Sequence, residues 1–285
     1  MRSVSLRYAC ALATVALGLG MQLQSAQGKD FGQILSLGDS ITAGSGSTGG
    51  YRDPLYTSLS GNGDSFTFVG SQVETTDSKL INAGQAHHEG HGGYRINDID
   101  GNLTALHTGT PYDSTLNGGH WLDGISSGDN ARPAIYPNIV LLLAGTNDIS
   151  NGVSVNWYTN DNLKTRMRSL LNDLFAARPD AQVFVGTVTK RTLDHAAQVV
   201  EFNAFLPTLL AEPQYAGRKL YLVDLYTAVG DNISDGVHPN TVGYAAIGGA
   251  WYSAIQQHAS PVPEPTSFCL LAVGGAMLLS RHRKV

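Results

Sequence analysis

Cysteine is almost absent from this sequence of 285 residues: its two cysteines, Cys10 and Cys269, lie near opposite ends. The region between them therefore has no disulfide and no thiol chemistry. Basic residues are also scarce, with 18 Lys and Arg against 23 Asp and Glu. Because the two ends hold five of the basic residues and one of the acidic ones, residues 29–260 carry a net charge near −9. A domain of this charge is a poor candidate for binding nucleic acid or an anionic membrane.

Nucleotide-binding and metal-binding motifs are missing as well. Despite 33 glycines, the chain has no G-x-x-x-x-G-K-[ST], and no G-x-G-x-x-G opens a helix after a strand. His87 and His91 in "HHEGH" stand four residues apart, but the order differs from H-E-x-x-H. The glycines at positions 90, 92 and 93 also argue against the helix that would align the two imidazoles. We therefore expect neither a cofactor nor a metal ion.

The N-terminus has the three parts of a secretory signal peptide. Arg2 and Arg7 precede the apolar run "YACALATVALGLGM", and the small-residue stretch "SAQG" follows before Lys29. We predict that residues 1–28 are a signal peptide cleaved after Gly28. The chain would then be exported.

No long hydrophobic run is present at the C-terminus, where the apolar stretch "TSFCLLAVGGAMLLS" is shorter than the roughly 20 residues that cross a bilayer. It follows "PVPEP" and precedes Arg281, Arg283 and Lys284. Proline, apolar segment and basic tail in this order resemble the PEP-CTERM sorting signal of exopolysaccharide-producing Gram-negative bacteria. We therefore assign residues 261–285 to a sorting and membrane-anchor segment, recognised by export and sorting machinery; a buried terminal helix is the alternative. This places the chain at the cell surface, the outer membrane or the extracellular matrix.

Between the ends, apolar runs alternate with amphipathic stretches. Five runs are expected to be strands covered on both faces: residues 34–37, 66–70, 138–145, 181–189 and 219–226. Helices are predicted around 163–175, over 196–212, and over 241–257 with Asn240 as the N-cap. The long polar region from Thr75 to Asn130 is expected to form loops at the carboxyl edge of the sheet. This alternation predicts one α/β domain with a mainly parallel sheet, over residues 29–260.

Ser40 lies in "ILSLGDSITAG", directly after a short buried strand and a tight turn. The stretch is not a G-x-S-x-G elbow, because Thr42 replaces the second glycine. Such a serine either attacks an acyl carbon or caps the helix that follows. As a nucleophile it needs a neutral imidazole to take its proton, an acid to orient that imidazole, and donors for the oxyanion.

Candidates for these partners occur in turns and at strand ends. Asp235 and His238 in "SDGVHPN" are close enough for one turn to fix both, although Asp-Gly and His-Pro could simply mark a loop. Asn147, in "GTND" after an apolar run, can present a side-chain N–H to an oxyanion. The alternative is that Asn147 or Asp148 caps the next turn. The glycines in "HHEGHGGYRIND" could bring a backbone N–H to the same place.

Together the blocks "GDSIT", "GHGGYRI", "GTND" and "DGVHPN" resemble, in order and approximate spacing, the four blocks of the SGNH hydrolases, or GDSL esterases. The resemblance spans residues 33–257. It implies a three-layer α/β/α flavodoxin-like domain, Ser40 as nucleophile, His238 as base and Asp235 as its orienting acid. It also implies an oxyanion hole made by the N–H groups of Ser40 and Gly93 and the side chain of Asn147.

Which glycine belongs to the second block is open between Gly90, Gly92 and Gly93. We prefer Gly93 because it directly precedes an aromatic residue, as in similar enzymes. The segments "GGYRDPLYTSL", "FTFVGSQ" and "HEGHGGYRI" are similar in sequence to the acetylxylan-esterase branch of this family. The expected activity is therefore hydrolysis of small acyl esters, acetyl esters above all, on polysaccharides.

Four alternatives remain open from the sequence. A lipase or lysophospholipase is a second enzymatic hypothesis, and a catalytically silent glycan-binding surface protein is a non-enzymatic one. His195, which follows Asp194, is a rival base, but it is better explained as the start of a helix. Three aromatic residues could stack on sugar rings or serve only in packing: Tyr94, Trp121 and Trp157.

Overall fold

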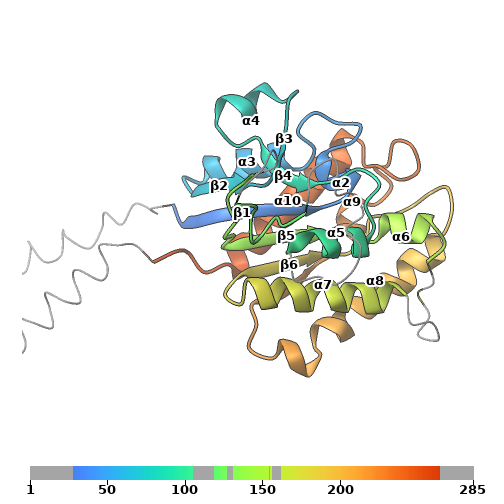
Figure 1. Ribbon diagram of the computed structural model, residues 1–285. Coiled ribbons are helices and arrows are strands. Elements are labelled where there is room, and N and C mark those ends of the chain that lie inside the picture. The colour runs from blue at the N-terminus through green and yellow to red at the C-terminus, as the bar shows by residue number, and fades with distance from the viewer. Residues whose placement is uncertain (1–27, 105–118, 127–130, 154, 156–161, 264–285) are drawn as a thin grey trace, which may run out of the picture.

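The computed structural model describes residues 28–104, 119–126, 131–153, 155 and 162–263. The strands in this part of the chain are β1 (Asp30–Gly38), β2 (Ser65–Val69), β3 (Gln72–Val73), β4 (His87–Gly90), β5 (Ile139–Leu143), β6 (Gln182–Gly186) and β7 (Leu220–Val223). They form one sheet in the order β3-β4-β1-β5-β6-β7 (Figure 1), and β2 also pairs with β1. All pairings are parallel except that of β3 with β4. The predicted mainly parallel α/β sheet is confirmed.

Helices cover both faces of this sheet, which gives three layers (Figure 1). One face packs against α5 (Ile96–Leu103), α7 (Leu163–Ala177) and α8 (Ala196–Leu210). The other packs against α3 (Arg52–Gly61), α9 (Leu225–Val229) and α10 (Thr241–His258). Shorter elements complete the fold: α2 (Ser40–Ala43), α4 (Ser78–Asn82), α6 (Thr146–Ser150) and the 3₁₀ turn η1 (Pro213–Tyr215).

The central strands explain why both faces are apolar. In β5, Val140 and Leu142 belong to the cluster with α5, α7 and α8, whereas Ile139 and Leu141 belong to the cluster with α3, α9 and α10. Successive side chains of a strand point to opposite faces, so a strand covered on both sides must be apolar throughout. β5 and β6 are buried along their whole length, as their continuous apolar runs predict.

The five predicted strands and the three predicted helices are present. Asn162 and Asn240 cap α7 and α10, because their side chains accept from the N–H groups of Thr165 and Gly243. β2 and β7 differ from the expectation of strands covered on both faces: Ser65 and Thr67 of β2 are exposed, and β7 is an edge strand in which Leu222 is 37% exposed. Only one neighbour, β6, pairs with it in the described sheet.

The prediction of loops from Thr75 to Asn130 is wrong for much of that region, which contains α4, β4 and α5. Ile96, Ile99 and Leu103 follow a helical spacing and are fully buried against the sheet. The short length of these elements and their glycines and polar residues concealed this pattern. Residues 105–118 and 127–130 lie outside the described part.

The predicted signal peptide and the predicted sorting segment fall almost entirely outside the described residues. Ser260 and Val262 still contact the domain: Ser260 N–H donates to Gln182 Oε1 at 2.7 Å, and Val262 N–H donates to the carbonyl of Asp30 at 2.7 Å. Among the helices that the structure describes, none combines the length and the apolar character needed to cross a bilayer.

Candidate active site

Ser40 is the first residue of α2, directly after the carboxyl end of β1. The preceding residue, Asp39, is the N-cap: its carboxylate Oδ1 accepts from Ile41 N–H at 2.9 Å. Ser40 therefore does not cap the helix, and that alternative is wrong. Its hydroxyl Oγ lies 2.9 Å from His238 Nε2, and the residue is only 8% exposed.

The turn before α10 holds the imidazole. Asp235 Oδ1 accepts from the N–H groups of Val237 at 3.0 Å and His238 at 2.8 Å, and Oδ2 lies 2.7 Å from His238 Nδ1. Partial burial raises the pKa of Asp235, but the hydrogen bonds from His238 and Val237 outweigh it and lower the pKa to about 2. An ionised carboxylate only accepts, so Nδ1 carries the proton and Nε2 is free to accept from Ser40. The Asp-Gly and His-Pro turn thus does more than mark a loop.

Gly93 lies in a turn beyond the carboxyl end of β4. Tyr94 N–H donates to the carbonyl of His91 at 3.2 Å, and Gly93 has φ +82°. Gly92 and Gly93 are both exposed at this turn. Gly90 has a different, steric role: a Cβ at this position would lie 2.3 Å from the backbone nitrogen of Ala43. It lets β4 pass close to α2.

Asn147 lies in α6, beyond the carboxyl end of β5. Its side-chain Nδ2 donates to the carbonyl of Tyr94 at 2.9 Å, which leaves the second N–H of the amide for another acceptor. Gly145 is the N-cap of α6 and no side chain caps this helix, so the capping alternative for Asn147 and Asp148 is wrong. Ser40, the Gly93 turn and Asn147 therefore follow three strands that are neighbours in the sheet, β1, β4 and β5.

Asp148 anchors the segment that carries Asn147. Its carboxylate accepts from Ile96 N–H at 2.9 Å and from Arg166 Nη1 at 2.7 Å. Burial raises the pKa of Asp148, while these hydrogen bonds and the Arg166 charge act in the opposite direction. A buried carboxylate held by a guanidinium fixes α6 against α5 and α7.

Comparisons with known proteins identify the family of the chain. Residues 36–246 match the GDSL-like Lipase/Acylhydrolase family. The chain belongs to this family. It is therefore a member of a family of carboxylic ester hydrolases.

Individual relatives of this GDSL-like chain are carbohydrate esterases or esterases by name. A multidomain esterase of Ruminococcus flavefaciens is 28% identical over 250 residues, which are 82% of this chain but only 30% of that protein. The solved structure of a Clostridium thermocellum family 3 carbohydrate esterase is 28% identical with a TM-score of 0.59, and covers 80% of this chain and 96% of that one. A family 3 carbohydrate esterase of Talaromyces cellulolyticus, 24% identical, shares the fold with a TM-score of 0.56 over 79% of this chain and 96% of its own.

Other predicted site residues have structural roles. Trp121 is 1% exposed and packs against the ring of His91, so the hypothesis that it stacks on a sugar is wrong. Tyr94 is half-buried, and Trp157 lies outside the described residues. His195 is the N-cap residue of α8, as expected, and the neighbouring Asp194 binds Arg191.

The "HHEGH" histidines do not converge. His87 is exposed, with Nδ1 3.1 Å from the carbonyl of Gly70, whereas His91 is buried against Glu89. Nowhere in the described ranges do three or more His, Cys, Asp or Glu side chains group in a way that could hold a metal ion. Glu89 was not recognised from the sequence as a residue near the site, and no motif marks it.

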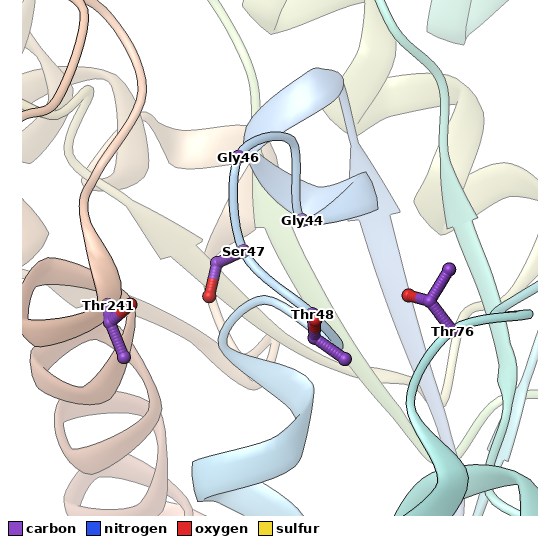
Figure 2. Close-up of a pocket in the computed structure, with 6 residues that line it drawn as sticks. All are labelled: Gly44, Gly46, Ser47, Thr48, Thr76 and Thr241. Atoms are coloured by element: carbon purple, nitrogen blue, oxygen red, sulfur yellow. The ribbon is translucent and has the colours of Figure 1, made fainter.

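A groove of about 670 Å³ lies between the loop after α2 and the first turn of α10 (Figure 2). Its lining is small and polar: Gly44, Gly46, Ser47, Thr48, Thr76 and Thr241. Gly44 follows α2, the single helical turn whose first residue is Ser40. Thr241 is the first residue of α10 and lies three residues after His238. Tyr244, one turn into α10, fixes the loop by donating from Oη to the carbonyl of Ser45 at 2.8 Å. The groove thus lies between the loop that follows α2 and the N-terminus of α10, the two segments next in sequence to Ser40 and His238.

Proposed function

We propose that this chain is an exported serine esterase that removes small acyl groups, acetyl above all, from polysaccharide hydroxyls. The observation that carries the proposal is the hydrogen-bonded series from Ser40 Oγ through His238 to Asp235. The similarity of the chain to a family 3 carbohydrate esterase supports the carbohydrate substrate. The signal-like residues 1–28 support export.

The proposed reaction runs through an acyl-enzyme. Ser40 Oγ attacks the ester carbon while its proton passes to His238 Nε2, and Asp235 stabilises the resulting imidazolium. The oxyanion accepts from Ser40 N–H, Gly93 N–H and the free N–H of Asn147. Collapse of the intermediate breaks the bond to the alcohol oxygen, which leaves with the proton from Nε2. Water then attacks the acyl-serine, giving its proton to Nε2, and release of the acid returns that proton to Ser40.

The groove gives the proposal a place for the alcohol. Because the leaving oxygen takes its proton from His238, we infer that the sugar extends toward the start of α10, where Thr241 and Ser47 line the groove. Hydroxyl groups suit a polar leaving group better than an acyl chain. This arrangement favours an acylated carbohydrate over a phospholipid.

The decisive experiment compares the wild type with Ser40→Ala on 4-nitrophenyl acetate, acetylated xylan, pectin, chitin oligomers and phospholipids. We expect acetate release from an acetylated polysaccharide and a loss of kcat of about 10⁴-fold or more in the variant, with an unchanged thermal midpoint. Undiminished turnover in the variant would refute Ser40 as nucleophile. Preferred cleavage of phospholipid would favour the lipase alternative, and glycan binding without hydrolysis the silent one.

A further inference from the structure

A buried carboxyl group lies beneath the Gly93 turn. Glu89, in β4, is fully buried and pairs with Leu37 of β1 in the sheet. It accepts from Ser71 N–H at 2.7 Å and Ser71 Oγ–H at 2.6 Å, and one oxygen lies 2.7 Å from His91 Nε2. These contacts satisfy both oxygens and fix the carboxyl group. It therefore offers a rigid partner to the imidazole of His91.

The His91 ring is held on both faces as well as at Nε2. It stacks on Trp121 with centroids 4.6 Å apart and on Tyr94 at 4.7 Å, with interplanar angles of 9° and 21°. The backbone N–H of His91 donates to the carbonyl of Gly38 at 3.0 Å, two residues before Ser40. His91 thus links the end of β1 to the turn that carries Gly93.

Tyr94 extends this link to the other oxyanion donor. Its N–H donates to the carbonyl of His91, which closes the turn around Gly93, and its own carbonyl accepts from Asn147 Nδ2 at 2.9 Å. The ring of Tyr94 lies on His91 and its backbone touches both donor-bearing segments. A continuous set of contacts therefore runs from Glu89 to Asn147.

We infer that Glu89 and His91 are positioning residues that set the oxyanion donors of Gly93 and Asn147 relative to Ser40; this rests on the proposed function. Neither side chain is assigned a contact with substrate, because Glu89 is bound to Ser71 and His91, and the His91 ring is covered on both faces. Oxyanion donors act only when they lie about 2.7–3.1 Å from the developing charge. A displacement of about 1 Å can reduce the rate by about 10²-fold.

The test measures kcat and KM on 4-nitrophenyl acetate for the full chain and for His91→Gln, His91→Phe and Glu89→Gln. His91→Gln loses the stacked ring, and His91→Phe keeps the stack but loses the hydrogen bond. We expect kcat to fall by about 10²-fold with KM nearly unchanged, because the affected contacts form in the transition state. In His91→Phe the buried carboxyl group of Glu89 loses its imidazole partner. In the double variant Glu89→Gln/His91→Phe a neutral amide replaces that carboxyl group, so we expect kcat to recover above that of His91→Phe.

His88→Gln is the matched control. His88 is as buried as His91 and lies three residues before it, in β4, but its Nδ1 accepts from Gly90 N–H instead. We expect its kcat within twofold of wild type, even if its thermal midpoint falls. All assays are run well below the lowest midpoint.

Wild-type kcat in folded His91 variants would overturn the inference, as would an equal loss in His88→Gln or a change in KM alone. Absence of Ser40-dependent turnover in the wild type would instead overturn the proposed function and this inference together.

Discussion

The two carboxylate oxygens of Asp39 have opposite effects on the stability of the fold. One oxygen caps α2, while the other is buried and has no hydrogen-bond partner among the described residues. Burial raises the pKa of Asp39 to about 7, although the Ile41 hydrogen bond and the His238 charge act against it. Between about pH 4 and pH 7 the folded chain therefore binds a proton at Asp39 that the unfolded chain has released. This group makes the protein less stable as the pH rises through that interval.

Replacing Asp39 with Asn should remove that penalty. The Asn oxygen can still cap α2, and the side chain no longer ionises. We expect the difference in unfolding free energy between Asp39→Asn and wild type to rise in favour of the variant from pH 4 to pH 8, by up to roughly 4 kcal/mol. Urea unfolding at several pH values measures it. A difference that stays constant with pH would contradict the prediction.

Asp235 and His238 make a second prediction about pH. Because the pKa of Asp235 is lowered to about 2, this carboxylate stays ionised across the assay range. Asp235 therefore does not set the acid limb of kcat/KM, whereas the imidazole of His238 must be neutral to take the Ser40 proton. We expect activity to fall on acidification, because a protonated imidazole cannot accept the Ser40 proton, and we expect Asp235→Asn to keep that limb.

The same variant tests how much the acid contributes. The side chain of Asp235 is 57% exposed, so water can partly replace its effect on the imidazolium. We expect kcat of Asp235→Asn to fall by about 10- to 100-fold, less than the ~10⁴-fold loss for a buried triad aspartate. A pH–rate profile of both proteins gives the result. Wild-type kcat in the variant would exclude Asp235 from the proposed mechanism.

At the scale of elements, the passage of β4 beside α2 explains why three nearby glycines are not equivalent. A Cβ at Gly90 would meet backbone atoms of Ala43 and Thr42, at 2.3 and 2.6 Å. At Gly93 the space is open but φ is +82°, a conformation that L residues adopt at a cost of about 1–2 kcal/mol. At Gly92 the space is open and φ is not in the left-handed region.

These differences predict three outcomes for substitution with alanine. Gly90→Ala should lower the unfolding free energy by about 1–3 kcal/mol or more, because backbone atoms cannot move aside. Gly93→Ala should lose kcat with a smaller loss of stability, because relief of strain shifts its N–H. Gly92→Ala should change neither by much. Urea unfolding and 4-nitrophenyl acetate kinetics separate them, and equal kcat for Gly92→Ala and Gly93→Ala would contradict our choice of Gly93.

Elements of this domain differ in how well the sequence predicts them. β5 and β6 are predicted because burial on both faces demands an unbroken apolar run. β4 could not be predicted, because its sequence "HHEG" has no apolar residue although its last three residues are buried. Only the tertiary structure reveals that Glu89 finds Ser71 and His91 there. Short elements with buried polar residues give no periodic signal.

Over the whole molecule, the candidate site depends on segments far apart in the chain. Ser40 and His238 are separated by 198 residues. Their proximity could be predicted only because four motifs occur in the order known from a family. Contacts that hold those motifs, such as Arg166 with Asp148, have no motif of their own. Their existence depends on how α5, α6 and α7 pack, which residue types and spacing do not specify.

Helix α7 provides a matched test of these long-range contacts. Arg166 is 8% exposed and pairs with the fully buried Asp148, whereas Arg168 pairs with Glu212 at a partly exposed position. Removing one partner of a buried pair leaves an uncompensated charge, so Arg166→Met should lower the unfolding free energy by about 3–5 kcal/mol. Arg168→Met should cost about 1 kcal/mol or less. Urea unfolding measures both, and equal losses would show that Asp148 does not depend on Arg166 for its burial.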